Sequence, residues 1–249
     1  MKKLLTISLL LFASIANAQQ SFFRTNNNYV VPVISFAAPV IITNGLVFNL
    51  DAGNPSSYNG SGNTWTDLTG NGNNVTLTNT GYSLVNGGGI ALNTNGYGTQ
   101  TLANSPFNGD FTWSTIFKFK GNDWDWIYNV GGYNGLILAA PSKPALSWGG
   151  WFYNMINANS ESSLTDGNYY MLTFVRSGNA ISCYLQASPY GTGSSVSGNI
   201  SLVSPLIGKG PGGEAWPNGI VNVILLYNKA LTQTEITQNY IAYSARFGF

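Results

Sequence analysis

The sequence predicts an all-β protein, an antiparallel sandwich or barrel with one helix near its C-terminal end. Apolar and polar residues alternate with a period of two over residues 46–51 and 111–119, as in half-buried strands. Clusters of Asn, Gly, Ser and Pro separate such stretches, and no helical period lies between them. The chain is long enough for a single domain with one core.

Two further strand patterns support this fold class. Residues 170–176 and 180–186 flank Ser177-Gly178-Asn179, which predicts a β-hairpin. Residues 220–227 are nearly all apolar, which predicts a strand that is buried on both faces. Within residues 111–119, Trp113 is in phase with Phe111 and Phe117, so we expect its side chain in the core.

One helix is predicted from its N-terminal signal. Thr232-Gln233-Thr234-Glu235 is a capping box, in which the first and last side chains satisfy backbone N–H groups. Leu231 precedes the cap and can pack against Ile236. We expect this helix to run to about Tyr243.

The composition excludes several kinds of active site. The 249 residues include no His and one Cys, which excludes His-based triads, Cys-cluster metal sites and an intramolecular disulfide. Only 8% of the residues are charged, with 10 Lys and Arg against 9 Asp and Glu. The surface is therefore polar through amides and hydroxyls, which suits neutral ligands and argues against a nucleic-acid partner. Cys183 is in phase with apolar neighbours, so we expect it to be buried.

The first residues resemble a secretory signal. A basic start precedes an apolar run from Leu4 to Ile15, and Ala16-Asn17-Ala18 is a small-x-small cleavage site before Gln19. The run is shorter than the ~20 residues that span a bilayer, so we expect cleavage and no membrane span in the mature protein. The predicted location is extracellular or at the cell surface, with the periplasm as the alternative.

These features divide the chain into three parts. Residues 1–18 are the predicted signal peptide, and residues 45–249 are the predicted domain. Between them, residues 19–44 contain prolines and β-branched residues, which predicts an extended N-terminal extension or linker.

Three stretches carry the motifs of a known family. GLVFNLDAGNPSSYNGSGNTWTDLTGNGNNVTLTN from Gly45 is similar to its opening strand and its Trp-x-Asp-x-(Ser/Thr)-Gly-Asn-Gly turn. YYMLTFVRSGNAISCYLQ from Tyr169 is similar to its hairpin, and NGIVNVILLYNKALTQTEITQNY from Asn218 to its last strand and closing helix. The chain thus resembles the laminin G-like branch of the concanavalin A-like lectin/glucanase superfamily, which implies a jelly-roll β-sandwich over residues 45–249. This fold serves lectins, hydrolases, adhesins and spacers.

Aromatic and acidic residues outside the regular strands are the candidate carbohydrate-binding residues. Indole faces stack on sugar rings, and carboxylates accept hydrogen bonds from sugar hydroxyls. We expect Trp216 to be exposed because it lies in a Gly- and Pro-rich loop. For residues 123–126 the alternative is a core Trp beside a solvated loop. The candidates are Asp123, Trp124, Asp125, Trp151, Tyr153 and Trp216.

Carboxylates that could support catalysis or metal binding are few. The glucanase members carry Glu-x-Asp-x-x-Glu on one strand, and this chain does not. Only Asp123 and Asp125 are closely paired, so we assign no catalytic residue. Asp67 and Asn71 offer oxygen ligands that suit calcium, although an Asx-type turn is the favoured interpretation of this loop. Members of the family often carry an acidic pair where this chain has Asn222-Val223, and this departure weakens the expectation of a metal at that place.

We expect a secreted carbohydrate-binding or adhesive lectin-like module without catalysis, with a neutral polysaccharide or cell-surface glycan as its partner. One alternative is a polysaccharide-degrading hydrolase or lyase of the same fold that uses Asp123 or Asp125. The other is a structural or surface-display module without a small ligand. The sequence identifies neither the glycan nor the oligomeric state.

Overall fold

The structure is a computed structural model that describes residues 19–24, 30–35, 40–102, 107–121, 125–139, 143–147, 164–194 and 204–249. The chain divides into two compact units, Met1–Pro39 and Val40–Phe249. In the first unit, β1 (Gln19–Arg24) and β2 (Val30–Ser35) form an antiparallel hairpin. The predicted signal peptide lies outside the described residues, and the predicted boundary between an extension and a domain at residue 45 stays a prediction.

The second unit is built from antiparallel strands, as the alternating pattern predicts. Hydrogen bonds join ten of them in the order β10-β9-β8-β14-β6-β15-β7-β11-β12-β13, while β3 pairs with β15, β5 with β6, and β4 with β5. A short 3-10 helix, η1 (Val85–Gly87), precedes β6. The strands are β3 (Leu46–Asp51), β4 (Thr64–Trp65), β5 (Val75–Ser83), β6 (Gly89–Gln100), β7 (Phe111–Lys118), β8 (Asp125–Asn129), β9 (Gly135–Ala139), β10 (Lys143–Ser147), β11 (Tyr169–Ser177), β12 (Ala180–Leu185), β13 (Ser188–Ser194), β14 (Leu206–Ile207) and β15 (Ile220–Tyr227).

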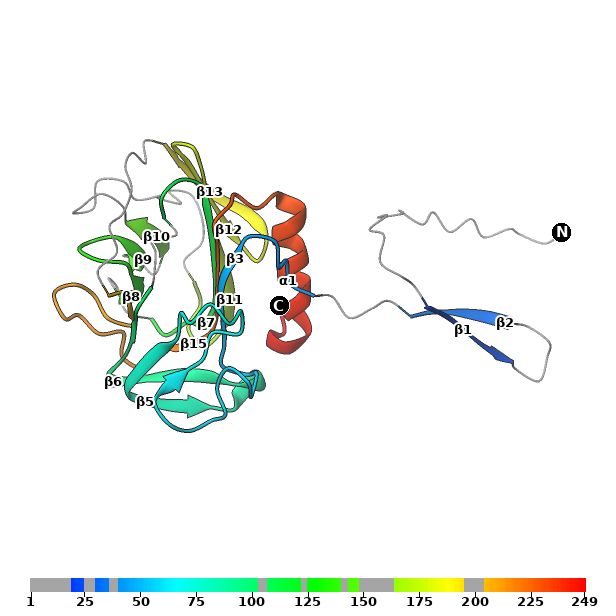
Figure 1. Cartoon of the computed structure of the whole chain (residues 1–249), viewed down its shortest axis with the longest axis horizontal. Coiled ribbons are helices and arrows are strands. Elements are labelled where there is room, and N and C mark those ends of the chain that lie inside the picture. Colours follow the sequence, from blue (N-terminus) through cyan, green and yellow to red (C-terminus); the bar gives the residue numbers. More distant parts are fainter. Residues whose placement is uncertain are drawn as a thin grey trace. The chain divides into compact units, whose positions relative to one another are not determined.

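The sheet curls so that its two halves share one hydrophobic core (Figure 1). Trp113 of β7 packs edge-on against Tyr128 of β8, with ring centroids 4.6 Å apart, although three strands (β14, β6 and β15) lie between β8 and β7 along the sheet. Phe48 of β3 also stacks on Tyr128. The architecture confirms the predicted jelly-roll β-sandwich, including the burial of Trp113.

Strand β15 lies at the middle of the sheet and is buried on both faces, as its apolar sequence predicts. Ile224 and Leu226 contribute to the core between the two halves. Leu225 and Tyr227 alternate with them and contribute to a second core on the opposite face. The hairpin of β11 and β12 is also where the sequence predicts it, and Cys183 on β12 is buried. Burial raises the pKa of its thiol.

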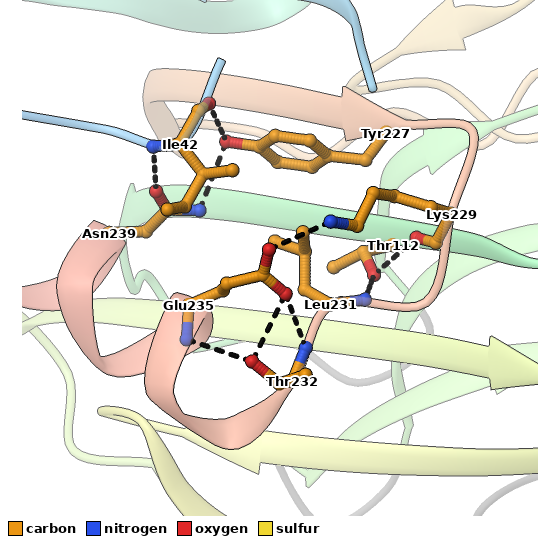
Figure 2. A network of polar contacts seen from close by, with 8 residues as sticks. All are labelled: Ile42, Thr112, Tyr227, Lys229, Leu231, Thr232, Glu235 and Asn239. Carbon is orange, nitrogen blue, oxygen red and sulfur yellow. Dashed lines mark hydrogen bonds and ion pairs between the residues drawn. The ribbon is translucent and has the colours of Figure 1, made fainter. Parts of the chain in front are cut away.

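Helix α1 (Gln233–Phe247) covers the outer face of β7, β11 and β15 through this second core. Its capping box is confirmed: the Glu235 N–H donates to Thr232 Oγ1 at 3.3 Å, and the Thr232 N–H donates to Glu235 Oε2 at 2.8 Å (Figure 2). The helix ends one turn later than the predicted Tyr243. It stops where Gly248 adopts a left-handed φ of 74° and donates its N–H to the Ser244 carbonyl.

The segment just before β3 docks on α1 and β15. Asn239 is fully buried and accepts a hydrogen bond from the Ile42 N–H at 2.8 Å. The Tyr227 hydroxyl donates to the Ile42 carbonyl at 3.0 Å and accepts from Asn239 Nδ2 at 3.0 Å (Figure 2). Both backbone groups of Ile42 are therefore satisfied by the sandwich. Within the described residues, no helix has the length and apolar character needed to cross a membrane.

Candidate functional site

A polar hollow of about 400 Å³ lies on the connection between β3 and β4. Most of its wall consists of hydroxyl and amide side chains, which can donate as well as accept hydrogen bonds. None of the lining residues carries a charge. The lining residues are Pro55, Ser56, Ser57, Asn59, Ser61, Gly62, Asn63, Thr64 and Thr66.

Hydrogen bonds within the connection fix the first part of this wall. The chain leaves β3 at Asp51, whose Oδ1 accepts from the Gly53 N–H at 3.0 Å. Asn54 then forms an Asx-type turn, because its Oδ1 accepts from the Ser56 N–H at 3.0 Å. The Asn54 carbonyl also accepts from the Tyr58 N–H at 2.9 Å. The sequence Asp-Ala-Gly-Asn-Pro therefore folds locally into a tight turn with its polar groups paired.

Two side chains tie the connection to the sheet. Ser57 Oγ accepts from the Asp51 N–H at 3.1 Å and donates to the Thr66 carbonyl. The Tyr58 hydroxyl donates to the Gly62 carbonyl at 2.9 Å, and its ring packs on Tyr82 with centroids 5.4 Å apart. Burial raises the pKa of Tyr58, and the neighbouring Tyr82 adds to the effect, so this hydroxyl stays neutral. These bonds hold the hollow in one shape.

The carboxylate at the start of this connection is already paired. Arg246, near the end of α1, donates from Nη1 to both oxygens of Asp51 at 2.7 and 2.9 Å. The side chains of Arg246 and Asp51 are only 23% and 11% exposed, so the pair is shielded from solvent. Asp51 therefore adds little net charge to the surroundings of the hollow.

Asp125 and Trp216 are the predicted carbohydrate-binding residues that the structure describes. Asp125 lies on β8, where it is 6% exposed, so its carboxylate is not offered to solvent. Strand β8 pairs with β9 and β14 and is buried along its whole length, which explains the difference from the predicted binding edge. Asp123, Trp124, Trp151 and Tyr153 lie outside the described residues, so their predicted roles stay predictions.

The predicted exposure of Trp216 is wrong. The indole is fully buried, packs edge-on against Phe117, and donates from Nε1 to the Lys120 carbonyl at 3.2 Å. Gly219 makes room for it, because a Cβ at that position would lie 2.3 Å from the indole ring. The loop thus turns its Trp into the core rather than toward a ligand.

The structure favours the Asx-type turn over calcium at Asp67 and Asn71. The buried Asp67 Oδ1 accepts from the Asn49 and Thr69 N–H groups, each at 3.0 Å. Its Oδ2 accepts from the Thr69 hydroxyl at 2.8 Å and from Asn73 at 3.3 Å. Asn71 donates its side-chain amide to a carbonyl of β3. Both carboxylate oxygens of Asp67 are thus already engaged by donors of its own turn and of β3. Across the residues that the structure describes, no group of three or more His, Cys, Asp or Glu could hold a metal ion.

The hollow was not predicted from the sequence. The Asn, Gly and Ser residues at 59–63 indicate a turn, which does not by itself indicate a hollow. A usable signal was present, because hydroxyl and amide residues are concentrated between two aromatic residues, Tyr58 and Trp65. Both aromatic side chains are buried, so the polar residues between them must face outward.

Several solved structures are similar in fold to this chain. Trypanosoma rangeli sialidase aligns with a TM-score of 0.62 and 20% identity, over 83% of this chain and 34% of the sialidase chain. Domain 4 of AbnA, a GH43 extracellular arabinanase from Geobacillus stearothermophilus, in complex with arabinotriose, aligns with a TM-score of 0.61 and 16% identity, over 78% of this chain and 98% of that chain. The receptor-binding domain of botulinum neurotoxin C/D mosaic serotype aligns with a TM-score of 0.58 and 12% identity, over 80% of this chain and 51% of that chain. The chain thus spans about a third of the sialidase chain. A comparison with curated proteins gave no match.

These structures correct the predicted function. We expected a secreted, non-catalytic lectin-like or adhesive module, whereas the similar structures include a sialidase and a domain of an arabinanase. The fold family is compatible with glycan hydrolysis as well as with glycan binding. The assignment to a non-catalytic module is therefore wrong as stated.

A family model establishes the relationship that the sequence motifs indicate. The model is described as the concanavalin A-like lectin/glucanases superfamily, and it matches residues 92–237 of the 249. The match begins within β6 and ends within α1, so the hollow at residues 55–66 precedes it. Because the model covers more than half of the sequence, the chain belongs to the concanavalin A-like lectin/glucanases superfamily.

Proposed function

We propose that this chain recognises glycans and that the hollow between β3 and β4 receives a neutral oligosaccharide. The observation that carries the proposal is the lining, in which hydroxyl and amide groups are plentiful and no residue is charged. Sugar hydroxyls both donate and accept hydrogen bonds, so such a lining is complementary to them. The proposal concerns recognition alone and makes no claim about secretion, adhesion or the absence of catalysis.

The size and stiffness of the hollow support this proposal. Its volume of about 400 Å³ is in the range of small-molecule sites, roughly 300–1,000 Å³. The hydrogen bonds of Asn54, Ser57 and Tyr58 fix the wall before any ligand arrives. A rigid wall loses little conformational entropy on binding, which favours affinity. Fold similarity to a sialidase and to an arabinanase domain agrees with a glycan as the ligand class.

Filling the hollow tests the proposal. Thr64 lines the hollow on β4, and Thr234 is an exposed Thr on α1 outside the lining. We expect Thr64→Trp to weaken binding at least ~10-fold, a loss of about 1.4 kcal/mol or more, because the indole occupies the ligand volume. Thr234→Trp is the matched control and should bind like the wild type, since it adds the same indole at a surface position away from the lining.

The measurement is calorimetric titration with arabinotriose and a panel of other neutral oligosaccharides. The proposal predicts that at least one of them binds and that only Thr64→Trp loses it. Binding to none, or equal binding by Thr64→Trp, would contradict the site. Release of new reducing ends in the same samples would show that recognition is accompanied by hydrolysis.

A further inference from the structure

We propose that Asn59, on the rim of the hollow, is a site of self-catalysed deamidation that converts its neutral amide into a carboxylate. Asn59 is exposed and is followed by Gly60, whose backbone nitrogen can reach the side-chain carbon of the preceding residue. Asn59 Oδ1 accepts two hydrogen bonds, from the Ser61 N–H at 3.1 Å and from Ser61 Oγ at 3.2 Å. The amide carbonyl is therefore polarised at the atom where negative charge develops during attack.

The reaction needs only water. The Gly60 nitrogen gives its proton to solvent and bonds to Cγ of Asn59, while the carbonyl electron pair moves onto Oδ1. The two Ser61 donors stabilise that oxyanion in the way an oxyanion hole does. The Cγ–Nδ2 bond then breaks, and Nδ2 leaves as ammonia after taking a proton from water, which closes a succinimide ring. Water opens the ring at either carbonyl to give Asp or isoaspartate, so one water is consumed and one ammonia is released, with no redox change.

The backbone at Gly60 favours this attack. Its φ of +90° is a conformation that residues with a side chain rarely adopt, and a Cβ there would lie 3.3 Å from the Tyr82 ring. A residue with a side chain would be strained at this position, whereas Gly fits it and hinders the approach of the nitrogen least. Among the described residues, none accepts a hydrogen bond from the Gly60 N–H, so the nucleophile is available.

Of the seven other Asn-Gly pairs in the sequence, two serve as references. Asn71 donates from Nδ2 to the Val47 carbonyl at 2.9 Å, and Asn134 donates from Nδ2 to the Gly131 carbonyl at 2.8 Å. In both, the nitrogen that would leave is held by the fold. In Asn59, the described hydrogen bonds are accepted by Oδ1 and do not involve the leaving nitrogen Nδ2. They therefore assist attack of the Gly60 nitrogen on Cγ.

The product changes the chemistry of the hollow. A carboxylate at residue 59 introduces negative charge into a lining that otherwise has none. Isoaspartate also lengthens the backbone by one methylene and so reshapes the rim. The deamidation itself does not depend on the proposed function. Its expected consequence, a slow loss of oligosaccharide affinity as the protein ages, rests on that function.

The test is peptide mapping by mass spectrometry of the purified full chain during incubation in mildly alkaline buffer. We expect Asn59 to convert at least ~10-fold faster than Asn71 and Asn134, and faster in alkaline than in acidic buffer because the Gly60 nitrogen must lose a proton. This comparison lies within the wild-type chain and needs no variant to fold. Conversion of Asn59 no faster than the two references would overturn the proposal.

A Ser61→Ala variant tests the role of the oxyanion donors. Removing the hydroxyl leaves the backbone donor in place and should slow conversion about fivefold, as expected for one exposed hydrogen bond. An unchanged rate would overturn the role of the Ser61 hydroxyl. Titration of fresh and aged protein with the oligosaccharide then separates the two proposals. Conversion without any oligosaccharide binding in the fresh protein contradicts the proposed function alone.

Discussion

At the residue scale, Asp67 shows an acidic side chain used to organise a loop. It is 4% exposed, and its carboxylate accepts hydrogen bonds from an N–H group of β3 and from N–H groups of its own turn. A buried carboxylate is costly unless its oxygens are hydrogen-bonded, and here each oxygen has more than one donor. The same arrangement that blocks a cation therefore stabilises the connection that follows β4.

We expect Asp67→Asn to lower the free energy of unfolding by about 2–3 kcal/mol, because the NH2 group that replaces one carboxylate oxygen cannot accept the hydrogen bonds of the buried donors. Asp110→Asn is the control, since Asp110 is exposed and its Oδ1 accepts a hydrogen bond from the Gly178 N–H at 2.7 Å. Denaturant unfolding measures both. Equal stability of the two variants, or a wild-type midpoint that rises with added calcium, would contradict this role of Asp67.

Single residues also show where sequence reasoning succeeds and fails. The burial of Trp113 follows from a period of two along its own strand, which is local information. The burial of Trp216 does not, because it depends on the space that Gly219 leaves and on Phe117 from another strand. A Gly- and Pro-rich loop therefore does not by itself show that its Trp side chain is exposed, because the core can have room for that side chain.

At the element scale, local signals predict where elements begin better than where they end. The capping box of α1 lies within four residues, so the sequence alone identifies it. The end of the helix depends on Gly248, a glycine whose left-handed φ is the usual stop signal and which our prediction overlooked. The shape of the hollow is harder to predict than a cap, since the connection that lines it is held by Tyr58 packing on Tyr82, a residue of β5 that lies far along the chain.

The start of α1 should make stability depend on pH. The hydrogen bond from Lys229 and the Thr232 N–H hold the pKa of Glu235 below its ordinary value (Figure 2). Because the folded-state pKa is lowered, the stabilisation is complete above the ordinary pKa of about 4.3 and is lost as pH falls through the folded value. Glu235→Gln keeps the cap acceptor but removes the charge, so we expect a loss of about 1 kcal/mol at neutral pH that disappears in acid.

Urea unfolding at neutral and acidic pH measures this difference between wild type and Glu235→Gln. Asp166→Asn is the matched control, because Asp166 also pairs with a Lys but both side chains are about half exposed, at 52% and 49%. We expect no measurable change in stability from that variant. A Glu235→Gln effect that persists unchanged in acid would show that the charge is not its cause.

At the scale of the whole molecule, export stays a prediction that one measurement tests. If residues 1–18 are a signal, expression in an exporting host should yield a mature protein that begins at Gln19. That residue is the first of β1 and pairs with Ser35, so cleavage would leave the hairpin whole. N-terminal sequencing of the exported protein is the measurement, and Ala18→Arg, which places a large charged residue at the cleavage site, is the control that should remain unprocessed. An exported protein that still begins at Met1 would contradict the prediction.

The central position of β15 has a consequence for biosynthesis. This strand pairs with β3, β6 and β7, yet it is the last strand of the sandwich to be made. A nascent chain therefore carries three strands with open edges until residue 227 has left the ribosome, and the two halves cannot close around their core before then. Folding of the sandwich must follow its synthesis rather than accompany it, and the unpaired edges are the surfaces that a chaperone would have to protect in the interval.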